Sequence, residues 1–246
     1  MNGRPATLPR NWPPGWHVEV VSETGSTNAD LLAAAAAGAP DRSVLCALHQ
    51  TAGRGRLDRR WDAPPGANLL VSLLFRDVPA AAHELTWRVG LAACAAAEQV
   101  AGVTPTLKWP NDLLVGDHKL AGVLAQASFG GPGGAGGQGG PVVVVGIGMN
   151  VRWSPDGAAR LGADVDPLDV LAALLGAYDA LPADVLPLYR QRLGTLGRAV
   201  RVELPGDEVL EGRAVDVDPD GRLLVLDACA VTHRLDVGDI VHLRPQ

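Results

Sequence analysis

A loop rich in arginine and glycine is the first part of the chain whose residues could do chemistry. It runs from Leu48 to Trp61 with the sequence LHQTAGRGRLDRRW. Glycine lets backbone N–H groups come close to a ligand, and guanidinium groups match the oxygens of phosphates and carboxylates. Neither the helical nor the strand period fits the segment, so it is predicted to be a loop that binds an anion. Taken alone, it could equally be a solvated basic loop or a segment that contacts nucleic acid.

Composition narrows these alternatives. The chain has 246 residues, of which 47% are hydrophobic, enough for one large domain or a main domain plus a small one. Its net charge is −6. A nucleic-acid partner requires a basic face, so this balance argues against nucleic acid as the main partner. A local basic loop on an acidic protein favours a small anionic ligand.

The cysteines and the apolar runs exclude other classes. Cys46, Cys94 and Cys229 are far apart and form no CxxC pair, so we expect buried, inert thiols and neither a metal site nor a disulfide. No stretch reaches the roughly 18 apolar residues of a membrane span, and the N-terminus lacks the apolar region of a signal peptide. We therefore expect a soluble, cytoplasmic protein with no membrane partner.

The elements that must position the loop follow from periodicity and turn residues. Ser26 or Thr27 is predicted to cap a helix that ends before Gly38. Helices are predicted at 28–37, 83–101, 167–178 and 182–193. Strands are predicted at 17–21, 44–49, 69–75, 107–109, 113–115 and 119–126, with a further strand from 142.

The predicted domain organisation has three parts. Residues 1–15 read as a disordered lead and 16–194 as the main domain, in which the glycine-rich stretch 130–141 is a flexible excursion. Residues 195–246 alternate as five short strands with hairpin turns, which predicts a small SH3-like β-barrel.

Several motifs occur in one order and together carry a resemblance. They are Ser26-Thr27-Asn28, HQTAGRGR (49–56), Trp61, KWPND (108–112), KLAGVL (119–124) and GIGMN (146–150). With this set the chain resembles the biotin protein ligases. The resemblance covers about residues 17–150 by motif and 195–246 by the small β domain.

The resemblance implies a fold and a reaction. The fold class is α+β, with a mixed-sheet catalytic core like that of class II aminoacyl-tRNA synthetases and lipoate ligases, and a C-terminal SH3-like barrel. Biotin and ATP would give biotinyl-5′-AMP, and biotin would then pass to a lysine on the biotin carboxyl carrier domain of an acyl-CoA or pyruvate carboxylase. Mg²⁺ is expected with ATP, and because it keeps several waters, no cage made of protein ligands alone is required. Members can dimerise by joining sheets, and the missing N-terminal DNA-binding module implies a ligase that is not also a repressor.

The resemblance also assigns residues. Joining two anions requires fixed positive charge, and the catalytic candidates are Lys119, Arg54 and Arg56, which would also contact biotin and the adenylate. The other expected biotin-binding residues are Ser26, Thr27, Asn28, Gln50, Gly55, Gly122 and Gly148. The other expected ATP- or adenylate-binding residues are Arg59, Trp61, Asn111, Asp112 and Asn150. The loop would be mobile when empty and close over the adenylate.

Two positions depart from the family pattern. Asp58 stands where the loop usually has glycine, and we hypothesise that its carboxylate weakens retention of the adenylate. The test is Asp58→Gly, which should slow adenylate release. Gln126 stands where a glutamate is expected, which puts a supporting salt bridge in doubt.

Three alternatives remain at this point. A lipoate or octanoyl ligase or transferase would have the same fold, although the arginine loop and KWPND favour biotin. A biotin-binding module without catalysis is disfavoured by the intact Lys119, Arg54 and Arg56. A nucleic-acid binder is disfavoured by the net charge.

Overall fold

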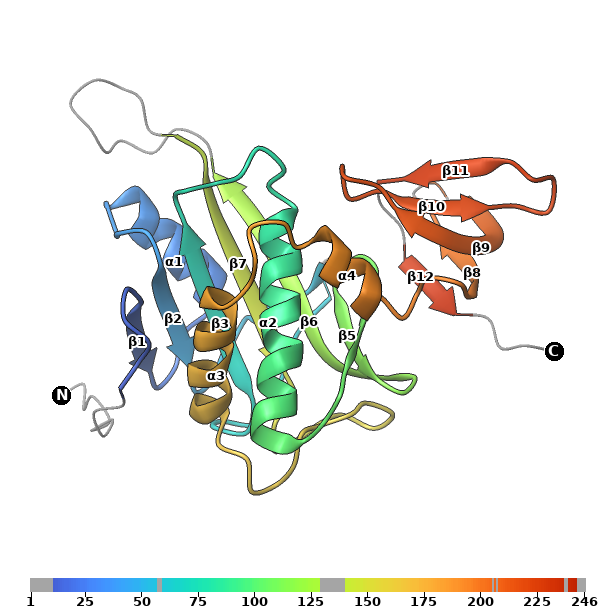
Figure 1. Cartoon of the computed structure of the whole chain (residues 1–246). Helices are drawn as coiled ribbons and strands as arrows, with labels where there is room; N and C mark the ends of the chain where they lie inside the picture. Colours follow the sequence, from blue (N-terminus) through green and yellow to red (C-terminus); the bar gives the residue numbers. More distant parts are fainter. Residues whose placement is uncertain are drawn as a thin grey trace.

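The computed structural model describes residues 11–56, 59–128, 140–204, 206, 208–236 and 239–242. Within them the chain forms a seven-stranded sheet with four helices and a separate five-stranded sheet (Figure 1). Asp58, most of the glycine-rich stretch and residues 1–10 lie outside the described residues, so their predictions stay untested. Trp12, in the predicted lead, packs against the core.

The large sheet is mixed. In spatial order its strands are β1 (His17–Val21), β2 (Ser43–Ala47), β3 (Leu69–Phe75), β7 (Val142–Met149), β6 (His118–Ser128), β5 (Asp112–Val115) and β4 (Thr106–Lys108). The β1–β2 pair is parallel and the other pairs are antiparallel. The long central strands β3, β7 and β6 form the floor on which a site can be built.

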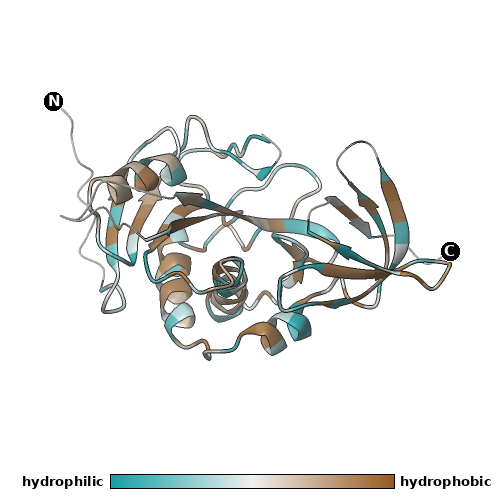
Figure 2. Ribbon diagram, turned by 90° about the horizontal axis from the view of Figure 1, so that it is seen from above, coloured by the Kyte–Doolittle hydropathy of each residue, from teal (hydrophilic) through white to brown (hydrophobic). Residues whose placement is uncertain are grey.

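Helices cover both faces of this sheet. On one face α2 (Glu84–Ala101) and α3 (Pro167–Asp179) pack on the main core, and on the other α1 (Thr27–Ala36) packs on Leu45, Leu74 and Val144. Figure 2 shows the sheet as a layer between them, with α2 seen end-on. Because β3 is covered on both faces, all seven of its residues are buried, which explains its continuous apolar run LLVSLLF.

Several details of the elements differ from the predictions. Strand β2 ends at Ala47 rather than 49, because the chain there turns to pair with the segment before α1: Thr24 N donates to His49 O at 3.1 Å. Helix α4 (Leu186–Arg192) begins four residues later than predicted, after Asp184 Oδ1 accepts from Leu186 N at 3.1 Å. Ser26 is the N-cap residue of α1, but its side chain makes no capping hydrogen bond.

The five-stranded sheet is antiparallel and comes from the C-terminal part of the chain. Its strands in spatial order are β11 (Thr232–Leu235), β10 (Leu223–Leu226), β9 (Val209–Val217), β8 (Ala199–Glu203) and β12 (Asp239–His242). The turn at 218–221 contacts the core, where Trp109 Nε1 donates to Gly221 O at 3.0 Å. The predicted α+β class, with a mixed-sheet core and a separate small β unit, is confirmed. Among the described residues, no helix is both long and apolar enough to span a membrane.

Candidate functional site

One cavity of about 360 Å³ lies over the central strands, beneath the arginine loop. It brings together every site residue that the sequence predicts: Ser26, Thr27, Asn28, Gln50, Arg54, Gly55, Arg56, Arg59, Trp61, Asn111, Asp112, Lys119, Gly122, Gly148 and Asn150. These residues come from the start of α1, the loop after β2, β5, β6 and β7. The cavity therefore draws on segments far apart in the sequence.

The arginine loop folds back on itself over the cavity. Trp61 N donates to Gly53 O at 3.0 Å, and Gly55 N donates to Arg59 O at 2.7 Å. A Cβ on Gly53 would lie 2.4 Å from Trp61 O, so only glycine allows this close approach. The described residues of the loop thus run antiparallel to each other and are joined by backbone hydrogen bonds.

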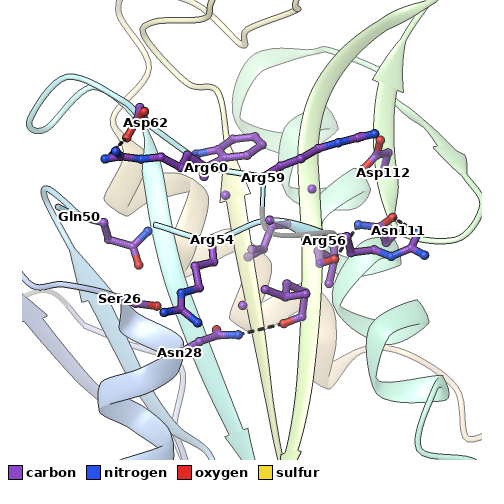
Figure 3. A pocket seen from close by; sticks show the side chains of 18 of the residues that line it. Ser26, Asn28, Gln50, Arg54, Arg56, Arg59, Arg60, Asp62, Asn111 and Asp112 are labelled. Carbon is purple, nitrogen blue, oxygen red and sulfur yellow. Dashed lines mark hydrogen bonds and ion pairs between the residues drawn. The ribbon is translucent and has the colours of Figure 1, made fainter. Parts of the chain in front are cut away.

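The loop points its arginines to different parts of the cavity. Figure 3 shows Arg54 reaching toward Ser26 and Asn28 at the start of α1, and Arg56 toward Asn111. Arg56 Nη1 donates to Asn111 Oδ1 at 3.2 Å. Arg60, which the sequence analysis did not assign, also lines the cavity. Successive guanidinium groups can therefore meet separate oxygens of one extended anion.

A buried polar group closes one end of the cavity, and we call it the amide end: Thr27, Asn28, Gln50 and Ser72. Thr27 and Asn28 are only 3% and 6% exposed. Gln50 Oε1 accepts from Thr27 N at 2.7 Å, which leaves the Gln50 amide nitrogen to donate elsewhere. Ser26, whose hydroxyl makes no helix-capping hydrogen bond, also lines this end. Such fixed donors and acceptors suit a small neutral ring with its own N–H and C=O groups.

One residue of this end, Ser72, was missed by the sequence analysis. Ser72, in the middle of β3, lies 2.7 Å from Thr27 Oγ1 and 2.6 Å from Asn28 Oδ1. A Cβ on Gly146 would lie 2.1 Å from Asn28 Oδ1, so the Asn28 side chain rests against bare backbone. The signal was available for Ser72, because it is the one polar residue in LLVSLLF.

Gln126 takes the place of the expected glutamate without forming a salt bridge. Its Oε1 accepts a hydrogen bond from Asn28 Nδ2 at 2.8 Å. A neutral amide therefore serves as the acceptor behind the amide end.

The other side of the cavity carries charge, and we call it the cation end: Lys119 with Arg56, Arg59 and Arg60, whereas Arg54 reaches toward the amide end. Lys119 Nζ forms an ion pair with Asp112 Oδ1 at 2.7 Å, and the lysine side chain keeps 40% of its exposure. A Cβ on Gly122 would lie 3.2 Å from Lys119 Nζ, so glycine leaves room for the ammonium group. Because Asp112 is close, Lys119 is held at a fixed place over the strands.

Trp61 lies between the loop and the sheet. Its indole rests on Gly148, where a Cβ would come within 2.5 Å, and Lys119 Nζ lies 5.8 Å from the ring centre. Its Nε1 is buried, with no hydrogen-bond partner among the described residues. Gly148 therefore makes space for the indole, in addition to any approach of a ligand.

Asn150 is expected to reach a nucleotide, but in the structure its side-chain amide forms hydrogen bonds with other protein groups. Nδ2 donates to Ala159 O at 2.9 Å, and Oδ1 accepts from Asn68 Nδ2 at 3.2 Å. The side chain is 3% exposed and ties the end of β7 to the segment at 155–159, which also lines the cavity.

The thiols stand apart from this site. Burial raises the pKa of Cys46 to about 12 and that of Cys94 to about 12. Cys229 is exposed, so the prediction of three buried thiols is wrong for this residue, which sits in a surface turn. In the part of the chain that the structure describes, no group of three or more His, Cys, Asp or Glu residues is arranged to hold a metal ion.

Comparisons with known proteins agree with this geometry. The model of the biotin/lipoate A/B protein ligase family matches residues 20–140, and that of the biotin protein ligase C-terminal domain matches 195–243. A biotin–[acetyl-CoA-carboxylase] ligase of Mycobacterium tuberculosis is 41% identical over 94% of this chain and 91% of its own length. One from Paracoccus denitrificans is 33% identical over 84% of this chain and 92% of its own.

A solved structure shares the fold. The biotin protein ligase from Aquifex aeolicus in complex with biotin and ATP superposes with a TM-score of 0.71 at 23% identity, covering 93% of this chain and 99% of that one. With two relatives above 30% identity along most of their length, and with both family models matched, this chain belongs to the biotin protein ligase family.

Proposed function

We propose that the protein activates biotin with ATP and then transfers it to a carrier protein. In the first step a biotin carboxylate oxygen attacks the α-phosphorus; a C–O–P linkage forms, the α–β bond breaks and pyrophosphate leaves. In the second step a lysine amine attacks the acyl carbon, an amide forms, AMP leaves and the amine loses a proton. The M. tuberculosis relative is named for biotin and acetyl-CoA carboxylase, which supports a biotin carrier of a carboxylase as the acceptor.

The observation that carries this proposal is the contrast between the two ends of one cavity. The amide end offers fixed polar groups for an uncharged ring, and the cation end offers lysine and arginine for carboxylate and phosphate oxygens. A volume of about 360 Å³ lies in the usual range for small-molecule sites, roughly 300–1,000 Å³. A ligand with a polar ring, an apolar tail and an activated carboxylate fits that order of groups.

The proposed roles in activation follow from charge. Lys119, Arg54 and Arg56 offset the repulsion between the carboxylate and the α-phosphate, and such charge stabilises the transition state most when it is held in place. The ion pair with Asp112 at 2.7 Å supplies that fixed position for Lys119. Asn111, through its contact with Arg56, is proposed to steady the nearby guanidinium.

The proposed role of the loop in transfer is protection. A mixed anhydride hydrolyses in water, so a loop that closes over it preserves the acyl group for the amine. Trp61, lying on Gly148, is placed to exclude water from this region. Transfer goes directly from adenylate to lysine, which requires no thiol intermediate.

Mg²⁺ is proposed to arrive with ATP. Among the described residues, the carboxylates that line the cavity are Asp62 and Asp112, and each already faces a cation, Arg60 or Lys119. These residues do not fit a cage for the ion, whereas Mg²⁺ commonly keeps several waters and binds phosphate oxygens. When bound, the ion would neutralise the phosphates.

Further proposals concern partners and organisation. We propose a division near residue 195 between the catalytic core and the C-terminal β domain, in keeping with the small sheet that begins at β8. We also propose a cytoplasmic location, and we propose no nucleic-acid partner, because the net charge is −6. Pairing of two copies through a sheet edge remains a proposal that sedimentation would test, as does a pyruvate carboxylase acceptor.

The decisive experiment is ATP–pyrophosphate exchange on the purified protein with biotin, with lipoate or with neither. We expect exchange that requires biotin. Exchange supported by lipoate instead would reassign the substrate, a real alternative because the family model spans both kinds of ligase. Biotin binding without exchange would leave a non-catalytic binding module. A carrier domain added afterwards should gain mass equal to one biotinyl group, and a carrier with the acceptor lysine changed to arginine should not.

A further inference from the structure

Two residues that stand behind the cavity lining, Ser72 on β3 and Gln126 on β6, meet at the side chain of Asn28. Ser72 is fully buried, and Gln126 is half-buried. Asn28 lies at the start of α1, so its carboxamide crosses β7 at Gly146 to reach β6. One side chain therefore joins three central strands to the first turn of the helix that forms the amide end.

The orientation of the Asn28 carboxamide follows from its partners. One neighbour, 3.1 Å away, is the backbone carbonyl oxygen of Leu124, which can only accept, so the Asn28 atom there must be the nitrogen. The same nitrogen donates its second proton to Gln126 Oε1 at 2.8 Å. Both Nδ2 protons are used, and Oδ1 is left facing the Ser72 hydroxyl.

The hydroxyl proton of Ser72 must then be donated to Asn28 Oδ1, because this oxygen would otherwise face Ser72 Oγ without a donor between them. Asn28 Oδ1 cannot donate and lies 2.6 Å from Ser72 Oγ, so Ser72 must donate to it. Ser72 Oγ is also 2.7 Å from Thr27 Oγ1, and the Thr27 hydroxyl proton has two acceptors within reach, Ser72 Oγ and Gln50 Oε1 at 3.0 Å. Gln50 Oε1 meanwhile receives the Thr27 backbone N–H. Ser72 therefore donates to Asn28 and Asn28 donates to Gln126, while both acceptors of the Thr27 proton belong to the protein.

This arrangement has a consequence for the cavity. The Thr27 proton is spent inside the protein, so Thr27 Oγ1 presents only lone pairs to a ligand. The amide end then accepts an N–H from the ligand at Thr27, while the free nitrogen of Gln50 can donate. A hydroxyl free to rotate would lose this fixed polarity.

We propose that Ser72 and Gln126 are positioning residues for the ligand ring: they fix the Asn28 carboxamide and, through it, the hydrogen-bonding direction of Thr27. The inference rests on the proposed function, since it assumes that the ring of biotin occupies the amide end. It concerns ground-state binding of the ring and leaves the phosphate chemistry untouched.

The first test is Ser72→Ala, studied by calorimetric titration with biotin in the absence of ATP and by exchange kinetics. Removing the donor to a buried acceptor commonly lowers affinity about tenfold, so we expect Kd and KM for biotin to rise by about that factor. The KM for ATP and the kcat at saturating biotin should stay within about twofold. The matched control is Thr195→Val, which removes another fully buried hydroxyl, located between the two sheets, and should leave the biotin Kd unchanged.

The second test uses the more exposed partner, so that a folding failure of Ser72→Ala does not end the experiment. Gln126→Leu removes the acceptor from Asn28 and should raise the biotin Kd several-fold, whereas Gln126→Glu keeps an acceptor and should restore it. Equal biotin affinity in Ser72→Ala, Gln126→Leu and the unmodified protein would overturn the inference. So would a parallel rise in the KM values for biotin and ATP, which would indicate general loss of structure. Absence of biotin-dependent exchange in the unmodified protein would instead reject the proposed function.

Discussion

The two ends of the cavity are built in different ways. At the amide end, Thr27, Asn28 and Ser72 are buried and bonded to one another and to strand backbone. At the cation end, Lys119 keeps 40% of its side-chain exposure and Arg60 keeps 69%. The first end is set before any ligand arrives, whereas at the second end the exposed arginine side chains around the paired Lys119 can still rearrange around phosphates. A rigid recognition end and an adjustable chemical end are what a two-step transfer needs, because the ring stays while the leaving groups change.

Removing the Lys119 ammonium group should have the largest effect on activity of the changes to the cation end. We expect Lys119→Ala to lower biotin-dependent pyrophosphate exchange about 100- to 1,000-fold, the usual cost of losing one fixed charge at a transition state. Biotin affinity without ATP should fall much less, because the ring end is intact. Lys119→Arg is the matched control and should recover part of the rate. An alanine variant with unchanged exchange would remove Lys119 from the catalytic residues.

Two glycines of the same strand allow the ends to be compared directly. A methyl group at Gly146 would meet Asn28 Oδ1 at 2.1 Å, inside a buried network, whereas one at Gly148 would meet the Trp61 indole at 2.5 Å, on the loop. Overpacking that cannot relax costs about 1–3 kcal/mol. We expect Gly146→Ala to raise the biotin Kd about tenfold or more. Gly148→Ala should raise it less and speed adenylate release, because the indole can move with the loop. The reverse ranking in titration and release assays would contradict the rigid–adjustable contrast.

Salt concentration should affect ligand binding at the two ends differently, with smaller changes than those expected for the substitutions. At about 0.1 M salt, the interaction between exposed charges is largely screened beyond a distance of about 10 Å. This screening distance becomes shorter at higher salt concentration. Raising NaCl from about 0.05 to about 0.5 M should therefore increase the KM for ATP several-fold. Binding of biotinamide, which has the ring but no carboxylate, should change by less than about twofold. If the neutral analogue proved as salt-sensitive as ATP, the amide end would have to depend on charge.

Thiol modification should have the smallest effect. The raised pKa values of Cys46 and Cys94, about 12 each, leave almost no thiolate at pH 8, and both are buried. Iodoacetamide should label the native protein at Cys229 alone, as read by peptide mass spectrometry, and leave exchange activity unchanged. The Cys229→Ser variant should take up no label. Loss of activity on labelling would place a thiol in the mechanism, contrary to direct transfer from the adenylate.

The sequence supported much of the fold for identifiable reasons. Strands β1 and β3 were predicted with the bounds they have, because alternation and a doubly buried apolar run are strong local signals. The start of α4 was misplaced by four residues, since periodicity does not reveal the hydrogen bond from Leu186 N to Asp184 Oδ1 that precedes the helix. The exposure of Cys229 was misjudged because its apolar neighbours lie in a surface turn.

By itself the sequence determined which groups are present and which family the chain belongs to: the motifs around Arg54, Lys119 and Asn28 are local and ordered along the chain. Only the tertiary structure decided what those groups do to one another. Asn28 and Ser72 are 44 residues apart, and Asn28 and Gln126 are 98 apart, so their shared hydrogen bonds exist only once α1 packs across the sheet. Hydrogen-bond direction depends on which donors meet which acceptors in space, and that information is absent from any single segment.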